Sequence, residues 1–326
     1  MKGCASKVYP LLNLNTACLS CLLSLPSVPS CESHGVRRNK KFTRLWQSTL
    51  DFQSALYQLH LVKAETVRAF IPKELRLVEA FGYTLGGFFL ANYDDSPAGV
   101  FDELVVIAGI VWNPPTSCAW AARVLVNSEE ACHHGRKEVG LPSQVARFSK
   151  RITPVPRQTK DKFGGFLSMI GVGTTICHSK DCMDVQVTEV VGPASSDLCN
   201  IKLMTDVPTP KFNKWMGPSI TLSLPSFSGQ TEYNPNLLKY SCRLACRVRA
   251  VRPAKVSGPS PLKKERSHDS ESRGFTAEEV VDNARNLSIS VMLSKPILAL
   301  EFNFLEMQVE APIILSNNTT SSLPAA

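Results

Sequence analysis

Glu103 is the residue with the clearest capacity for chemistry, because it is a carboxylate followed directly by an apolar run that includes Val105, Val106 and Ile107. Burial among apolar neighbours disfavours the charged form of a carboxyl and so raises its pKa. Such a carboxyl can act as a general acid or base. The alternative is an inert, buried ion pair between Glu103 and Arg136.

Ser143 and the adjacent pair His133-His134 are weaker candidates for a nucleophile, a base or a metal ligand. Ser143 follows Pro142 outside any G-x-S-x-G frame, which favours a satisfied polar group in the core over a nucleophile. Neighbouring residues on a helix point about 100° apart. At most one of the two histidines can therefore face a shared site, and a solvated helix end is the favoured interpretation.

The stretch GRKEVGLPSQ, Gly135–Gln144, resembles the active-site signature of the acetoacetate decarboxylase-like family: Gly-Arg, a Glu, then Pro and two lysines. The segment GVFDE, Gly99–Glu103, resembles the part that brings in the acidic residue of that family. An earlier Ile71-Pro72, followed by Glu74-Leu75, is similar to its opening. The resemblance implies a β-rich scaffold around an enclosed cavity.

Two positions depart from that signature. The resemblance implies that the first lysine forms a Schiff base with a β-keto acid, and that the second keeps it uncharged. Ser143 and Gln144 stand at these positions, and neither side chain can form an imine. Lys137 and Lys150 do not take the catalytic place. We therefore expect the scaffold without its best-known reaction, and no cofactor or metal.

The same resemblance implies a set of residues that face the cavity. Carried over by motif, the candidates are Glu103, Arg136, Glu138, Ser143 and Gln144. An altered enzyme, an isomerase or a lyase, would use Glu103 and Arg136 as its catalytic pair. Aromatic side chains suit either an apolar cavity or simple core packing, and those considered are Phe88, Phe89, Trp112, Trp120 and Trp215.

Longer sequence segments between about Ser54 and Pro312 resemble a group of plant proteins within this family. That resemblance implies a protein required for neoxanthin biosynthesis, in the xanthophyll branch leading to abscisic acid, that does not itself convert violaxanthin. The implied partners are a carotenoid or other lipophilic small molecule, or a protein of xanthophyll metabolism. The pathway implies the chloroplast, and the cytoplasm is the alternative.

Hydrophobic periodicity predicts a mainly β protein: a β-rich α+β fold with an antiparallel barrel or sandwich and a few short helices. Short helices are expected at 63–70, at 127–138 and, within the polar insertion, at 276–285; the second has Asn127 and Glu130 as a capping box. The expected strands are 55–62, 83–93, 101–112, 117–126, 163–177, 183–191, 200–204, 219–224, 237–251, 287–293 and 297–309.

Charge and composition divide the chain into parts. Residues 1–50 hold seven basic residues against one acid, which accounts for most of the formal charge of +8 and argues against a nucleic-acid-binding face on the rest. We expect residues 1–53 to be poorly ordered, as a transit peptide or an artefact of the gene model. The domain then covers 54–312, with a disordered polar insertion at about 253–283 and a flexible tail, 313–326.

The cysteines and the apolar runs exclude other classes. Eleven scattered cysteines are typical of reduced thiols rather than a disulfide framework. Cys18 and Cys21, with Cys31 and His34 nearby, could ligate zinc, but an unstructured leader is the favoured interpretation. A run of eighteen apolar residues does not occur, so we expect no transmembrane helix.

Overall fold

A barrel forms the centre of the computed structural model, which describes residues 44–47, 54–113, 116–154, 180–191, 194–206, 217–229, 231–259 and 277–315. Seven strands close it through the pairings β13–β2–β4–β5–β6–β10–β11–β13. All of these pairs are antiparallel except β6–β10. The barrel strands are β2 (Ser54–Lys63), β4 (Tyr83–Tyr93), β5 (Phe101–Asn113), β6 (Thr116–Val126), β10 (Ser219–Gly229), β11 (Leu237–Val251) and β13 (Lys295–Val309).

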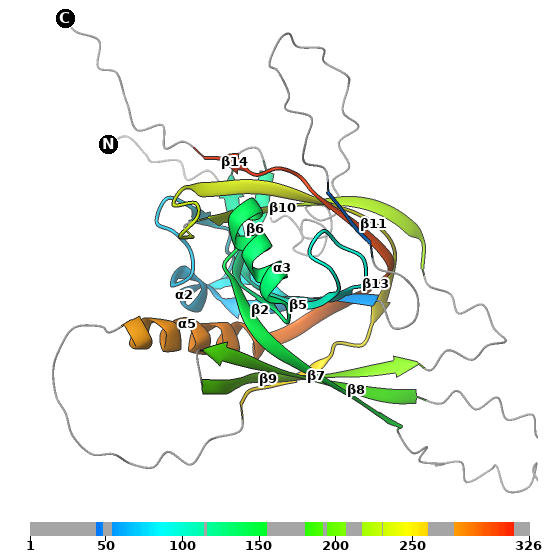
Figure 1. Ribbon diagram of the computed structural model, residues 1–326. Helices are drawn as coiled ribbons and strands as arrows, with labels where there is room; N and C mark the ends of the chain where they lie inside the picture. The colour runs from blue at the N-terminus through cyan, green and yellow to red at the C-terminus, as the bar shows by residue number, and fades with distance from the viewer. Residues whose placement is uncertain are drawn as a thin grey trace, which may run out of the picture.

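A second sheet covers one side of the barrel together with helix α5 (Ala277–Met292), as Figure 1 shows. It branches from β6 through a short parallel pairing to β7 (Ser143–Pro154) and continues in antiparallel order. Its further strands are β8 (Lys180–Val191), β9 (Ala194–Asp206) and β12 (Lys255–Ser257). Small elements complete the fold: β1 (Arg44–Gln47), α2 (Ala64–Arg68), β3 (Arg76–Leu77) and β14 (Ile313–Ile314). The mainly β fold with few short helices is confirmed.

Two apolar cores result, because strand side chains alternate between opposite faces. The first fills the barrel and includes Tyr57, Phe89, Val124, Leu244 and Met307. The second lies between the barrel wall, the second sheet and α5; its members include Phe88, Leu104, Val106, Val187, Ile201 and Val291. Strands β4 and β5 contribute to both cores and are therefore buried on both faces.

Gly87 allows the barrel wall to close between β2 and β4. Its φ of 137° lies in a region that side chains rarely adopt, and a Cβ there would stand 1.9 Å from the Gln58 carbonyl oxygen. The Gly86-Gly87 pair in the middle of an otherwise strand-forming run thus marks a close backbone approach.

Helix α5 differs from the sequence prediction. We expected a strand at 287–293, but the helix extends to Met292. Ser288, Val291 and Met292 are buried, and their spacing follows the helical period rather than strand alternation. The insertion at about 253–283 was predicted to be disordered, but it contains strand β12 and the start of α5. The expected strand 163–177 and the leader cysteines fall outside the described residues.

Helices in the described part of the chain are too short or too polar to cross a lipid bilayer. The predicted helix at 63–70 is present as α2, and β11 has the bounds predicted for it. On β11, Arg243 and Arg247 are exposed while Leu244 and Cys246 are buried, as expected for a strand with one solvated face.

A buried polar pair on β2 ties the two layers together. The Gln58 amide donates to His60 Nε2 (2.9 Å) and to the Ala254 carbonyl (3.2 Å), and its oxygen accepts from the Ala254 N–H (2.7 Å). His60 Nδ1 lies 3.0 Å from the Val291 carbonyl, so the neutral tautomer with hydrogen on Nδ1 satisfies every contact. Burial lowers the pKa of His60, and the bond to Val291 opposes that shift.

We expect this pair to make stability depend on pH. The unfolded chain binds a proton at His60 near pH 6.5 while the folded chain resists it. The contribution of His60 to the free energy of unfolding should be largest above that pH and fall below it, by at most about 1.4 kcal/mol per pH unit. Compared with wild type, His60→Gln should lack this component of the pH dependence in denaturant titrations between pH 8 and 5. The control is His133→Gln, since His133 is exposed; an unchanged slope in His60→Gln would contradict the assignment.

Candidate active-site cavity

The barrel encloses a cavity of about 330 Å³. This volume lies at the lower end of the range for small-molecule sites. The walls are chiefly apolar side chains of the first core, with Tyr57, Leu59, Phe89, Val105, Ile107, Ala119, Ala121, Val124, Leu244 and Met307 among them. The cavity can therefore enclose a small apolar molecule, or one end of a longer one.

Glu103 supplies the carboxyl in this interior. It lies near the start of β5, is 9% exposed and lines the cavity. The Tyr93 hydroxyl donates a hydrogen bond of 2.8 Å to its Oε2. Burial raises the pKa of Glu103 to about 7, although the bond from Tyr93 opposes the rise. The expectation of a raised pKa at this position agrees with the geometry, and near neutral pH the group can exchange a proton.

Three polar side chains from β10 and β11 share the Glu103 end of the cavity. Tyr240, Cys242 and Ser226 line it, and Tyr240 is hydrogen-bonded to Ser226. Burial raises the pKa of the Cys242 thiol to about 12, with a further contribution from the Glu103 charge. The thiol is therefore protonated, which makes Cys242 a poor nucleophile. We call Glu103, Tyr93, Tyr240, Cys242 and Ser226 the polar pole.

Helix α3 (Glu129–His134) carries the signature segment to the cavity and continues as a π-helical turn, η1 (Gly135–Val139). The N-cap is Ser128, whose hydroxyl accepts from the Ala131 N–H, and not the predicted Asn127. Asn127 instead accepts from the Asp102 N–H. A single π turn is common at functional sites, and here it ends at Gly140 in the left-handed conformation.

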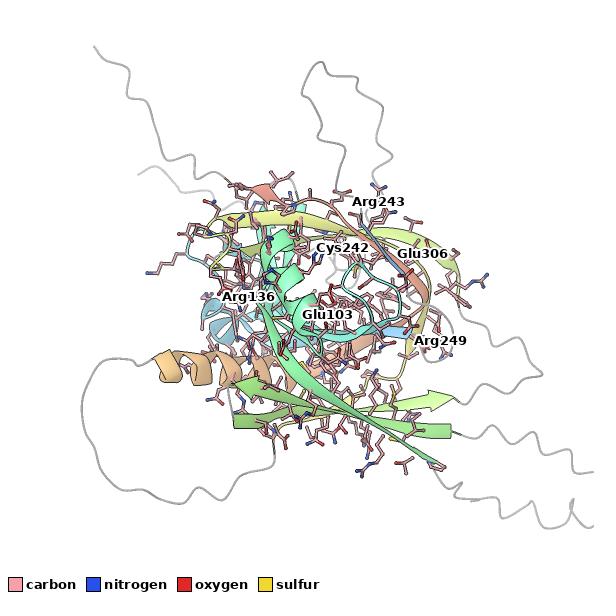
Figure 2. The ribbon with its side chains drawn as sticks, viewed as in Figure 1. Glu103, Arg136, Cys242, Arg243, Arg249 and Glu306 are labelled. Carbon is pink, nitrogen blue, oxygen red and sulfur yellow. The ribbon has the colours of Figure 1, made fainter. Side chains whose placement is uncertain are left out.

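Arg136 corrects one prediction. It does not pair with Glu103; its guanidinium forms an ion pair with Glu232, and its side chain is 34% exposed. Both Glu103 and Arg136 are labelled in Figure 2. The residues of η1 and its exit that do line the cavity are apolar: Gly135, Val139 and Leu141. In this structure Glu103 and Arg136 form neither the expected pair across the cavity nor an inert ion pair.

The other signature residues also lie away from the cavity wall. Ser143 is 2% exposed and packs against Gly135, with its Oγ 2.7 Å from the place a Cβ on Gly135 would take. Glu138 is half-buried and outside the lining, and Lys137 is exposed. Lys150 forms an ion pair with Asp102. Among the described residues, no lysine lines the cavity.

Gln144 points to the opposite side of β7 and joins a charged cluster between the two layers. Arg123 donates to the Gln144 side-chain oxygen and pairs with Glu189, which is also 3.0 Å from Arg285 Nε. Arg123 and Glu189 are almost completely buried. Two guanidinium groups thus share one carboxylate, and Gln144 contributes a neutral acceptor to a site with excess positive charge.

The predicted aromatic lining is only partly present. Phe89 lines the cavity, whereas Phe88 and Trp120 belong to the second core. Trp112 is 42% exposed, and Trp215 lies outside the described residues. His133, at the exposed end of α3, lies 3.2 Å from the Tyr233 hydroxyl. The described residues contain no group of three His, Cys, Asp or Glu side chains placed to hold a metal ion.

Sequence reasoning missed the hydroxyl and thiol members of the polar pole. Tyr240 and Cys242 alternate with outward-facing residues on β11. Once one interior residue of that strand is known, strand alternation predicts the others. Tyr93 ends β4 opposite Phe101. The pairing of β4 with β5 brings Tyr93 to Glu103, and the local sequence does not predict which strands pair.

The chain is similar to curated plant proteins over most of its length. It is 68% identical over 262 residues to "Protein NEOXANTHIN-DEFICIENT 1" of Arabidopsis thaliana, covering 80% of this chain and 91% of that protein. Identity is 62% over 274 residues to the protein of the same name from Solanum lycopersicum, covering 82% and 92%. A scan against protein-family models found no match.

Solved structures with a similar course of chain include two enzymes. Acetoacetate decarboxylase from Legionella pneumophila is 10% identical, with a TM-score of 0.47 over 97% of this chain and 100% of that one. The enduracididine biosynthesis enzyme MppR, complexed with pyruvate, is 10% identical, with a TM-score of 0.48 over 86% and 93%.

Glu103→Gln tests the energetic cost of the buried carboxylate. Because the folded pKa is about 7, folding favours the protonated form, and stability declines as pH rises from about 4.5 to 7. At pH 8 the free energy of unfolding of Glu103→Gln, measured by denaturant titration, should therefore exceed that of wild type by roughly 3 kcal/mol. The two proteins should converge near pH 4.5. Equal stability at both pH values would contradict a buried, ionisable Glu103.

Gln144→Lys tests the charged cluster. A second cation beside Arg123 should lower the free energy of unfolding by about 1 kcal/mol, because the site already holds excess positive charge. Gln144→Glu is the matched variant and should be at least as stable as wild type. Thermal unfolding in low and high salt measures both; the reverse order of the two variants would contradict the assignment.

Proposed function

The chain belongs to the NEOXANTHIN-DEFICIENT 1 family, and from that membership we propose that it is required for neoxanthin biosynthesis. We propose further that it acts by binding a lipophilic molecule in the barrel cavity, without Schiff-base catalysis. The observation that carries this proposal is an apolar cavity with a polar pole at one end. A ligand with an apolar body and a terminal hydroxyl or other hydrogen-bond donor fits such a site.

The energetics of Glu103 support a binding role. A carboxyl in an apolar interior lowers stability at neutral pH, and an apolar residue of similar size would pack there at lower cost. Proteins keep such costly groups chiefly where function uses them. Only Tyr93 hydrogen-bonds the Glu103 carboxyl among the described residues, so acceptor capacity remains for a ligand that donates a hydrogen bond.

The lining supports the absence of the decarboxylase reaction. Schiff-base catalysis needs a lysine amine within reach of the substrate carbonyl. The described lining has none, Ser143 packs behind Gly135, and Gln144 faces the other layer. The described lining is thus suited to hold a molecule and supplies no amine that could form an imine with it.

A second candidate function rests on one observation, the pKa of Glu103 near 7. A carboxyl of that pKa with an adjacent tyrosine hydroxyl could move a proton, as an isomerase or a lyase requires. Arg136 cannot assist, since it is paired with Glu232. In this form the enzyme would depend on Glu103 as its acid or base.

Complementation of a plant that lacks neoxanthin separates these functions. Ala119→Phe fills the cavity and should fail to restore neoxanthin, because the ligand loses its space. Ala250→Phe, which adds the same ring on the exposed face of β11, should restore it. Arg136→Met should also restore it. Restoration by Ala119→Phe, at normal protein level, would sink the binding proposal.

Glu103→Gln distinguishes binding from acid–base catalysis in the same plants. Glutamine keeps an oxygen that accepts hydrogen bonds but cannot exchange a proton near pH 7. Partial or full restoration is the result that binding predicts. Complete failure of Glu103→Gln with normal accumulation would favour the enzyme.

A further inference from the structure

The apolar lining of the cavity continues out of the barrel onto exposed surface. Val78 and Tyr83 line the cavity and are 41% and 39% exposed. Trp112, 42% exposed, pairs in register with Ser117, another lining residue. Exposed apolar surface that joins an internal cavity marks the path by which a lipophilic ligand enters.

Phe81 extends this surface further. It occupies the turn between Ala80 and Tyr83, whose backbones exchange hydrogen bonds of 2.8 and 3.0 Å. Its side chain is 83% exposed, and its φ is 53°, a conformation that is unfavourable for a bulky residue. A strained backbone that holds an aromatic ring in water gives nothing to the fold. We call Val78, Phe81, Tyr83 and Trp112 the apolar rim.

Charges around the apolar rim have a positive balance. Five basic residues and three acidic ones lie on the adjoining segments and strand ends: Lys63, Arg68, Lys73, Arg76 and Lys295 against Glu65, Glu74 and Glu79. Two ion pairs neutralise two bases and two acids, since Arg68 binds both oxygens of Glu79 at 2.7 Å and Lys63 lies 3.7 Å from Glu65. Lys73, Arg76 and Lys295 remain against Glu74. Arg76 stands directly opposite Trp112 in the β3–β5 pairing. Exposed cations therefore surround exposed aromatic rings.

We propose that the apolar rim docks this protein on an anionic lipid bilayer, so that a lipophilic ligand passes between the bilayer and the cavity. Aromatic rings that enter the headgroup region, with basic residues beside them, are the usual elements of interfacial binding. A protruding single ring suits a fluid lipid surface better than a preformed protein groove. The ligand transfer rests on the proposed function, whereas the docking can be measured without any ligand.

Sedimentation of the full chain with vesicles tests the docking. Vesicles of phosphatidylcholine with phosphatidylglycerol should bind the protein, and vesicles of phosphatidylcholine alone should bind it several-fold more weakly. Phe81→Asn should lower the partition roughly tenfold, because it removes a ring that enters the bilayer. Asparagine tolerates positive φ, so the variant should fold.

Phe304→Asn is the matched control. Phe304 is also exposed, at 42%, and also has a positive φ, of 52°, but it lies on β13 away from the apolar rim. Its replacement should leave the partition unchanged. Equal losses in Phe81→Asn and Phe304→Asn would overturn the proposal, as would equal binding to both kinds of vesicle.

Two further variants separate the charge and the cavity. Reversal of Lys73 and Arg76 to glutamate should weaken binding to the anionic vesicles and reduce its sensitivity to salt. Ala119→Phe should bind vesicles like wild type, because it alters only the interior. Failure of Ala119→Phe in plants with normal vesicle binding confirms that the two proposals stand separately. Absence of binding to anionic vesicles by wild type at low salt would end the docking proposal and leave the cavity proposal intact.

Discussion

Burial of β5 on both faces is the constraint on which the site depends. Leu104 and Val106 face the second sheet, while Glu103 and Val105 face the barrel interior. A strand in this position has no solvated side on which to place a charge. The Glu103 carboxyl therefore finds its polar partner on the neighbouring strand, where the Tyr93 hydroxyl at the end of β4 donates to it, and burial raises its pKa to about 7. The apolar cavity and its polar pole both follow from this placement.

Ser143 and Gln144, the two positions that differ from the decarboxylase signature, lie on opposite faces of β7. Ser143 faces the barrel but is covered by the π turn at Gly135, and Gln144 faces the charged cluster of Arg123, Glu189 and Arg285. A lysine at 144 would stand beside the Arg123 guanidinium, to which the exposed Gln144 side chain is hydrogen-bonded. Ser143 thus serves packing against the π turn, whereas Gln144 serves as a neutral acceptor at the edge of the charged cluster.

Much of the fold was legible in local pattern. The alternation on β11 and the runs that form β5 and β6 need only neighbouring residues for their prediction. The end of helix α5 was predicted as a strand because apolar residues alternate with serines from Leu287 to Val291, whereas in the structure Ser288, Val291 and Met292 are buried at helical spacing. At the site, Glu103 was identified from the resemblance of the segment Gly99–Glu103, and its apolar neighbours predicted the raised pKa. The ion pair of Arg136 with Glu232 was not predicted, since it joins residues 96 apart and depends on the phase of a π turn.

The contacts of Gln58 and His60 have a consequence for how the molecule comes apart. They join β2 to points 196 and 231 residues away in the chain, and each of their polar atoms is satisfied only while all partners are in place. If α5 or the β11–β12 connection detached, the Gln58 amide and the His60 imidazole would lose their hydrogen-bond partners inside an apolar core. Separation of the second sheet and α5 from the barrel therefore has a high free-energy cost. We expect both layers to open as one cooperative unit in hydrogen exchange.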